Sequence, residues 1–218
     1  MDAEAKETMQ GMYDLCDLIE NLVDKERLKA SNVEKISDVL KLCLLSYLAY
    51  LAASDGVISW KESEFIGEML NYNITPAKLK EFIENNNIYS TSFECTVPII
   101  MEIFVTFDNI VYKSGIFDYN DGVARESGKA LFLLYILLTR KMLALNGRNE
   151  DTMLPEEAEN VNTYLGMLNN YIENSYERNH TDLIVNFTKN DDTATSDGVR
   201  APRKNTGNES VRAPKKRI

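Results

Sequence analysis

One run of twelve residues, Leu42–Ala53, constrains the fold of this chain more than any other feature. Only Ser46 interrupts its apolar character. A helix that is apolar nearly all round lies at the centre of a helical bundle rather than on its surface. The run is shorter than the roughly 20 residues that span a bilayer, so we expect a buried core helix and no membrane span.

Helical periodicity continues through most of the remaining sequence. Apolar residues recur at three- and four-residue steps over residues 4–29, which predicts an amphipathic helix. Residues 31–34 have the capping-box pattern, which predicts a second helix that ends near Ala53. Further helices are expected over residues 59–70, from Thr75-Pro76, over 96–112, over 123–145 and over 154–176.

Alternating strand patterns are absent from these segments, and only residues 182–188 fit either a short strand or a helical turn. The sequence therefore predicts an all-α fold, a compact bundle of six to eight helices. Tyr47, Tyr50 and Tyr135 are expected to fill its core.

The last thirty residues, 189–218, differ from the body. Asn, Asp, Thr, Gly and Ser dominate there, so burial would not offset the entropy of ordering, and we expect a disordered tail. Seven basic residues after Gly198 face one acidic residue, so residues 200–218 carry +6 and residues 1–199 carry −16, which together give the net charge of −10. The acidic body argues against a specific nucleic-acid partner.

A near-repeat marks this tail: residues 199–204 read VRAPRK and residues 211–216 read VRAPKK. Two copies twelve residues apart are typical of a repeated linear motif that presents an extended, polyproline-like segment to an acidic protein partner. The candidate partner-binding residues are Arg200, Arg203, Lys204, Arg212, Lys215 and Lys216.

The cysteines and the N-terminal residues indicate in which cellular compartment the protein is expected. Cys16, Cys43 and Cys95 have no metal-ligand spacing and lie on apolar segments, so we expect reduced, buried thiols. The first five residues are acidic where a signal peptide is basic. Both features favour a cytoplasmic protein.

Catalytic signatures are scarce, and we expect no enzyme. His180 is the only histidine, and no phosphate-binding, dinucleotide-binding or nucleophile-elbow motif occurs. Residues 118–122 approach the EF-hand pattern, but their glycine comes one residue early and the twelfth position is Lys129. Turn chemistry is the better interpretation of that segment.

The segment Leu44–Glu62 resembles the TerB-like (tellurite-resistance) domain family. That family has an apolar, Ala-rich helix, then a small residue with Asp-Gly, then a Ser-x-x-Glu that opens the next helix. The matching residues are Asp55, Gly56, Ile58, Ser59 and Glu62. The resemblance covers about residues 35–177. It implies two related helical halves, an acidic surface thought to bind a divalent metal, and a place in a bacterial stress or defence system.

A second, altered copy of the motif follows the apolar helix over residues 131–145. Asn146-Gly147 stands where the first half has Asp-Gly, and a longer loop leads to Leu154–Glu157. This departure removes one carboxylate from a shared site. Hard cations such as Ca²⁺ or Mg²⁺ need several oxygen ligands. The candidate metal ligands are Asp55, Glu62 and Glu157, with Glu156 as an alternative to Glu157.

A structural role for the same residues stays open. Ser59 and Glu62 satisfy a capping box, and Asp55 is an ordinary polar turn residue. The metal hypothesis requires the two hairpin tips to meet in space, and the structural role does not. Only the metal hypothesis needs their carboxylates to converge on one point.

These observations predict three parts: an N-terminal amphipathic helix over residues 1–34 that packs on the core, a TerB-like helical domain over 35–188, and the basic tail over 189–218. The expected function is that of a non-enzymatic adaptor that binds a divalent metal through its acidic face and recruits partner proteins. The alternative is a purely structural interaction module without metal, whose tail docks on an acidic partner or on its own body. An unrecognised enzyme would require a deep pocket that gathers Asp55 and Glu62.

Overall fold

The computed structural model of the protein describes residues 3–28, 30, 32–54, 56–88, 96–114 and 127–176. These residues form seven α-helices and one short 3-10 helix without any strand, which confirms the predicted all-α bundle. The elements are α1 (Ala3–Leu22), α2 (Ile36–Ala53), α3 (Trp60–Leu70), α4 (Pro76–Asn86), α5 (Ile99–Ser114), α6 (Ser127–Leu145), η3 (Glu150–Thr152) and α7 (Pro155–Ser175). Residues 182–188 and the predicted disordered tail lie outside the described residues.

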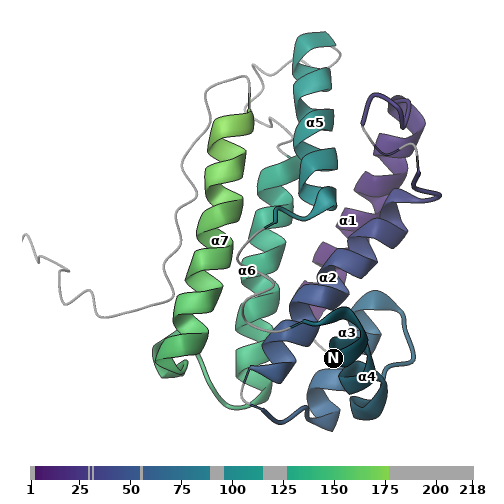
Figure 1. The fold of residues 1–218 in the computed structure, drawn as a ribbon. Coiled ribbons are helices and arrows are strands. Elements are labelled where there is room, and N and C mark those ends of the chain that lie inside the picture. The colour runs from purple at the N-terminus through teal and green to yellow at the C-terminus, as the bar shows by residue number, and fades with distance from the viewer. Residues whose placement is uncertain are drawn as a thin grey trace, which may run out of the picture.

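Five long helices, α1, α2, α5, α6 and α7, lie alongside one another, and the shorter α3 and α4 lie near the end where α2 stops (Figure 1). Helix α2 packs against α1, α3, α4, α5 and α6, and helix α6 packs against α1, α2, α3, α5 and α7. The central place predicted for the apolar run is confirmed. The N-terminal helix α1 packs on this core through α2, α3 and α6.

Three tyrosines meet at the middle of the bundle. Tyr47 on α2 stacks on Tyr164 of α7 with ring centroids 5.0 Å apart and meets Tyr135 of α6 edge-on at 4.9 Å. The Tyr47 hydroxyl lies 2.6 Å from Thr139 Oγ1, so a polar atom in the core is hydrogen-bonded. Tyr47, Tyr50 and Tyr135 are all buried, as the sequence predicts.

Helix α2 also passes a simple test for a membrane span. Its mean hydropathy over Ile36–Ala53 is 1.5, and by length and composition alone it is suited to cross a bilayer. Half of this window is buried inside the bundle, however, and the core helix of a soluble protein passes the same test. Five other helices pack against α2.

The predicted end of the first helix is wrong. The helix stops at Leu22, whereas the apolar periodicity continues to residue 29. Turn residues follow, in which the Asp24 carboxylate accepts a hydrogen bond from the Glu26 N–H at 3.0 Å. An aspartate that bonds the backbone two residues ahead favours a turn over helix continuation.

The capping box expected at residues 31–34 is also wrong as the start of the second helix. Helix α2 begins at Ile36, and its N-cap residue, Lys35, forms no side-chain cap bond. The Glu20 carboxylate of α1 instead accepts a hydrogen bond from the Ile36 N–H. A neighbouring helix thus supplies the cap, and the acid also suits the partial positive charge of a helix N-terminus.

Two of the three cysteines lie among the described residues. Cys16 is fully buried, and burial raises the pKa of its thiol to about 12. Cys43 is half-buried, and burial raises the pKa of this thiol as well. Both thiols are free and suppressed as nucleophiles, which agrees with their expected structural role. Cys95 lies outside the described residues.

Candidate functional site

The first hairpin tip joins α2 to α3, and its capping box is confirmed. Gly56 adopts a φ of 80°, which favours glycine, and its N–H donates to the Ala53 carbonyl at 3.0 Å. The Ser59 hydroxyl accepts from the Glu62 N–H at 3.2 Å, and Glu62 Oε2 accepts from the Ser59 N–H at 2.7 Å. This reciprocal pair fixes the start of α3 and places the Glu62 carboxylate at the tip.

The second carboxylate oxygen of Glu62 reaches the other hairpin. Glu62 Oε1 accepts a hydrogen bond from Asn146 Nδ2 at 2.9 Å, and Asn146 directly follows α6. Glu62 is only 1% exposed, so this bond to a charged acceptor lies in a region that excludes most water. An aspartate at position 146 has no hydrogen to donate when it is ionised. The asparagine at position 146 therefore supplies the donor for a contact between the two hairpin tips.

The second hairpin, formed by α6 and α7, also contacts the first through a glutamate. Glu157, like Glu62, is the third residue of its helix, and Glu157 Oε1 lies 2.7 Å from the hydroxyl of Ser54 at the end of α2. The Ser54 hydroxyl lies equally close to the Leu51 carbonyl, and its single hydrogen favours the carboxylate as the stronger acceptor. Each helix that starts at a tip thus presents a glutamate to the opposite hairpin. We call the four residues Ser54, Glu62, Asn146 and Glu157 the tip lock.

The charge of Glu157 is balanced within the protein. Arg148, in the loop between α6 and α7, places Nη1 2.9 Å from Glu157 Oε2. The side chains of Arg148 and Glu157 are 20% and 3% exposed, so this ion pair is largely withdrawn from solvent. Arg148 was not predicted as a site residue, although a basic residue in the loop between two helices of an acidic chain is a visible signal of an ion pair. The other missed member of the cluster, Ser54, is the small residue that precedes Asp-Gly.

The predicted metal ligands are only partly brought together. Glu62 and Glu157 join the same tip lock, whereas Asp55 lies outside the described residues. The four carboxylate oxygens of the two glutamates each accept a hydrogen bond from a protein donor. The described part of the chain holds no group of three or more His, Cys, Asp or Glu side chains suited to a metal ion. A cation at Glu157 would also lie beside the positive charge of Arg148, so the described residues fit an internal polar connection better than a divalent cation.

A third buried acid, Asp108, was not predicted from the sequence. Asp108 of α5 is 1% exposed, and its Oδ2 accepts a hydrogen bond from the Gly128 N–H at 3.0 Å and another from the Tyr176 hydroxyl. The carboxylate thus lies at the N-terminus of α6, where negative charge is favourable. Burial raises the pKa of this carboxyl, and its hydrogen bonds oppose that rise. The sequence does contain a sign of its burial, because Asp108 lies within the apolar stripe between Phe104 and Val111.

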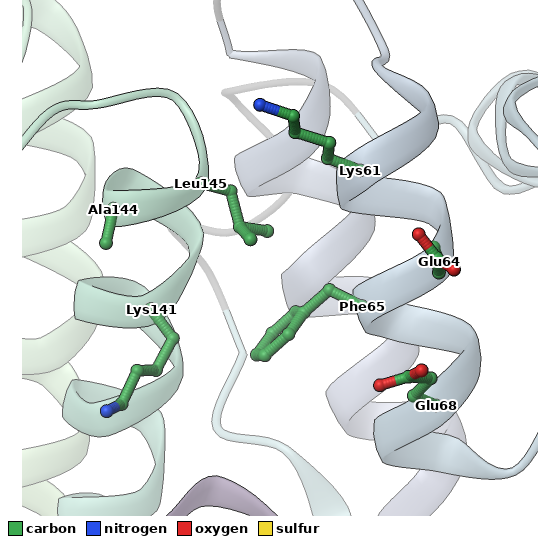
Figure 2. A pocket seen from close by; sticks show the side chains of 7 residues that line it. All are labelled: Lys61, Glu64, Phe65, Glu68, Lys141, Ala144 and Leu145. Carbon is green, nitrogen blue, oxygen red and sulfur yellow. The ribbon is translucent and has the colours of Figure 1, made fainter. Parts of the chain in front are cut away.

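Open grooves flank α3 on the surface. One, of about 340 Å³, lies between α3 and α6, with Glu64, Phe65 and Glu68 on its α3 side and Lys141 on α6 (Figure 2). A second, of about 440 Å³, lies along α3 between Trp60 and the turn after the helix. Neither groove is lined by Glu62 or Glu157. These two grooves therefore do not provide the pocket that the enzyme hypothesis requires around Glu62.

The candidate partner-binding residues of the tail also lie outside the described residues: Arg200, Arg203, Lys204, Arg212, Lys215 and Lys216. Comparisons of the chain with protein-family models, with curated proteins and with solved structures found no match. The resemblance to the TerB-like family stays a prediction that rests on the motif in residues 44–62.

Proposed function

We propose that this protein is a non-enzymatic helical adaptor. The tip lock is the observation that carries this proposal, because it uses the most buried carboxylates of the predicted site to join two helical hairpins. Side chains with both carboxylate oxygens occupied by protein donors stabilise a scaffold. The TerB-like resemblance adds the expectation of a cytoplasmic role in a bacterial stress or defence system.

The binding part of the adaptor is the basic tail. The +6 charge of residues 200–218 and the −16 charge of residues 1–199 separate the chain into a basic and an acidic region. The two VRAP repeats offer arginine and lysine at matching positions, which suits an acidic protein partner. The −16 charge of residues 1–199 disfavours phosphate backbones, so nucleic acid is a poor candidate partner.

The adaptor proposal is tested by capture of partners from a lysate of the source organism with the full chain as bait. A variant in which all six tail residues named above become glutamine is expected to lose the captured proteins while its helical circular dichroism is unchanged. A variant with Pro202→Ala and Pro214→Ala keeps the charge and separates the repeat motif from charge alone. Capture that survives removal of the six charges contradicts a tail-mediated adaptor.

The second candidate function is a metal-responsive adaptor. Its support is that Glu62 and Glu157 are both buried and each contacts the opposite hairpin, and that Asp55 follows Ser54 in the sequence. A divalent ion that binds only the folded state at 100 times its Kd adds about 2.7 kcal/mol. For a chain of this size that corresponds to a rise in Tm of roughly 5–10 °C.

A melting series after chelation, with Ca²⁺, Mg²⁺ or Mn²⁺ and matched ionic strength in NaCl, distinguishes the two candidates. The metal-free adaptor predicts equal Tm in every condition. A rise that is specific to one ion and lost in Glu157→Gln supports the metal-responsive adaptor.

A further inference from the structure

Four side chains at four-residue steps follow one exposed edge of α3 and of the turn after it. They are Trp60, Glu64, Glu68 and Tyr72, which we call the α3 stripe. Four-residue spacing keeps helical side chains on one face. Trp60 is 70% exposed and Tyr72 is 42% exposed, and both glutamates are exposed. All four residues line the open groove of about 440 Å³.

Small residues form the floor of this groove. Ser63 and Gly67 are buried and line it beneath the stripe. A Cβ at Gly67 would lie 2.7 Å from the Tyr72 carbonyl oxygen, and the Tyr72 N–H donates to the Gly67 carbonyl at 2.9 Å. The chain therefore turns back tightly at the end of α3 and brings Tyr72 to the groove. Between the two aromatic residues, Glu64 and Glu68 lie one helical turn apart (Figure 2).

This arrangement selects a ligand by its chemistry. Aromatic side chains at a groove bind proline and stack with cations, and the carboxylates between them pair with arginine or lysine. One ring already takes a cation within the protein, because Lys41 Nζ lies 5.8 Å from the centroid of the Tyr72 ring. An extended basic segment that contains proline is the expected ligand.

The chain itself contains two such segments, the repeats at residues 199–204 and 211–216. Each carries basic residues three positions apart with a proline between them. A polyproline II helix has three residues per turn and rises about 3.1 Å per residue, so these basic residues share one face and lie about 9 Å apart. The α3 stripe spans about 12 Å from Trp60 to Glu68, at about 1.5 Å per residue. The two spacings are close enough for one repeat to meet an aromatic ring and a carboxylate together.

We propose that the α3 stripe binds the basic repeats of the chain's own tail, an intramolecular contact that goes beyond the adaptor function. Chain length permits it. The 22 residues between Tyr176 and Val199 span at most about 73–79 Å when extended. Helix α7 is about 32 Å long, and its first turn contacts Ser54, which precedes α3 by a short loop. A bound tail competes with external partners for the same basic residues.

Trp60 is the only tryptophan of the protein, so its fluorescence reports on the stripe directly. The experiment measures acrylamide quenching of the full chain at about 20 mM and about 500 mM NaCl, since salt screens exposed charges. A docked tail shields Trp60 at low salt. The quenching constant is expected to rise at least about two-fold at high salt, and to be high at both salt concentrations in the variant with six neutral tail residues.

Matched variants assign the effect to the stripe. Glu64→Gln with Glu68→Gln is expected to expose Trp60 at low salt. The control pair Glu81→Gln with Glu159→Gln makes the same charge change at exposed positions on α4 and α7 and is expected to behave as the unaltered protein. The quenching of Trp60 is measured without any partner protein. Its result therefore tests the tail contact independently of the capture experiment, which tests the adaptor function.

Two results would overturn the proposal. The first is quenching that is equally strong in the unaltered protein, in the tail variant and in the stripe variant at low salt. The second is shielding that disappears on dilution, which would assign the contact to the tail of a second copy.

Discussion

The ion pair between Arg148 and Glu157 allows a quantitative test of how the second hairpin tip is stabilised. Arg148→Met removes the guanidinium and keeps a long apolar side chain. Glu157, whose side chain is 3% exposed, then keeps its charge with Ser54 as the remaining partner at its other oxygen. Breaking a fully buried pair costs about 3–5 kcal/mol. Because Arg148 is 20% exposed, we expect about 2–3 kcal/mol here, or a fall in Tm of roughly 4–12 °C.

The chain supplies a matched control in the pair formed by Arg140 and Glu150. Their side chains are 55% and 32% exposed, so Arg140→Met is expected to cost at most about 1 kcal/mol. Urea unfolding followed by circular dichroism measures both variants. The double variant of Arg148→Met with Glu157→Gln leaves no unpaired charge and is expected to recover about 2 kcal/mol relative to additivity. Equal losses for Arg148→Met and Arg140→Met, or strict additivity, would refute this reasoning.

Two further predictions concern buried positions outside the tip lock. Burial raises the pKa of Asp108, so the folded state favours the neutral form of this carboxyl more than the unfolded state does. The stability that comes from protonated Asp108 is therefore complete in acid. It is lost as pH rises from about 4 through the raised pKa of the folded state. The free energy of unfolding of the unaltered protein relative to Asp108→Asn is therefore expected to fall as pH rises above about 4 in urea titrations, and a difference that rises with pH would contradict the assignment. Gly67→Ala places a Cβ 2.7 Å from the Tyr72 carbonyl oxygen, and we expect a loss of about 1–3 kcal/mol, whereas Gly166→Ala, with open space around it, should cost none of this strain. Thermal melts of the two glycine variants check this, and equal Tm values would show that the turn after α3 is not tightly packed.

Local sequence signals predicted those parts of the fold that local interactions fix. The Ser59–Glu62 capping box and the start of α4 at Thr75-Pro76 are confirmed, because both caps lie within four residues of the groups they satisfy. The central position of α2 followed from its apolar surface. The start of α2 at Ile36 was missed, because its cap comes from Glu20, sixteen residues earlier on another helix.

The candidate site shows the same division between local and distant contacts. Sequence reasoning identified Glu62 and Glu157 and noted Asn146 as a departure from the motif. The partners were hidden, because Glu62 is 84 residues from Asn146 and Ser54 is 103 residues from Glu157. Asp108 was missed for a similar reason, since it caps a helix that begins nineteen residues later and pairs with Tyr176 from beyond α7.

The free energy of coupling between Glu62 and Asn146 tests most directly whether the tip lock joins the two hairpins. A double-mutant cycle with Glu62→Ala and Asn146→Ala, measured by urea unfolding, cancels the separate loss of the α3 capping box. For a hydrogen bond to a buried charged group we expect a coupling of about 1.5–3 kcal/mol. A coupling indistinguishable from zero would mean that the two hairpins are held together by apolar packing alone and that the polar contact between their tips does not stabilise the fold.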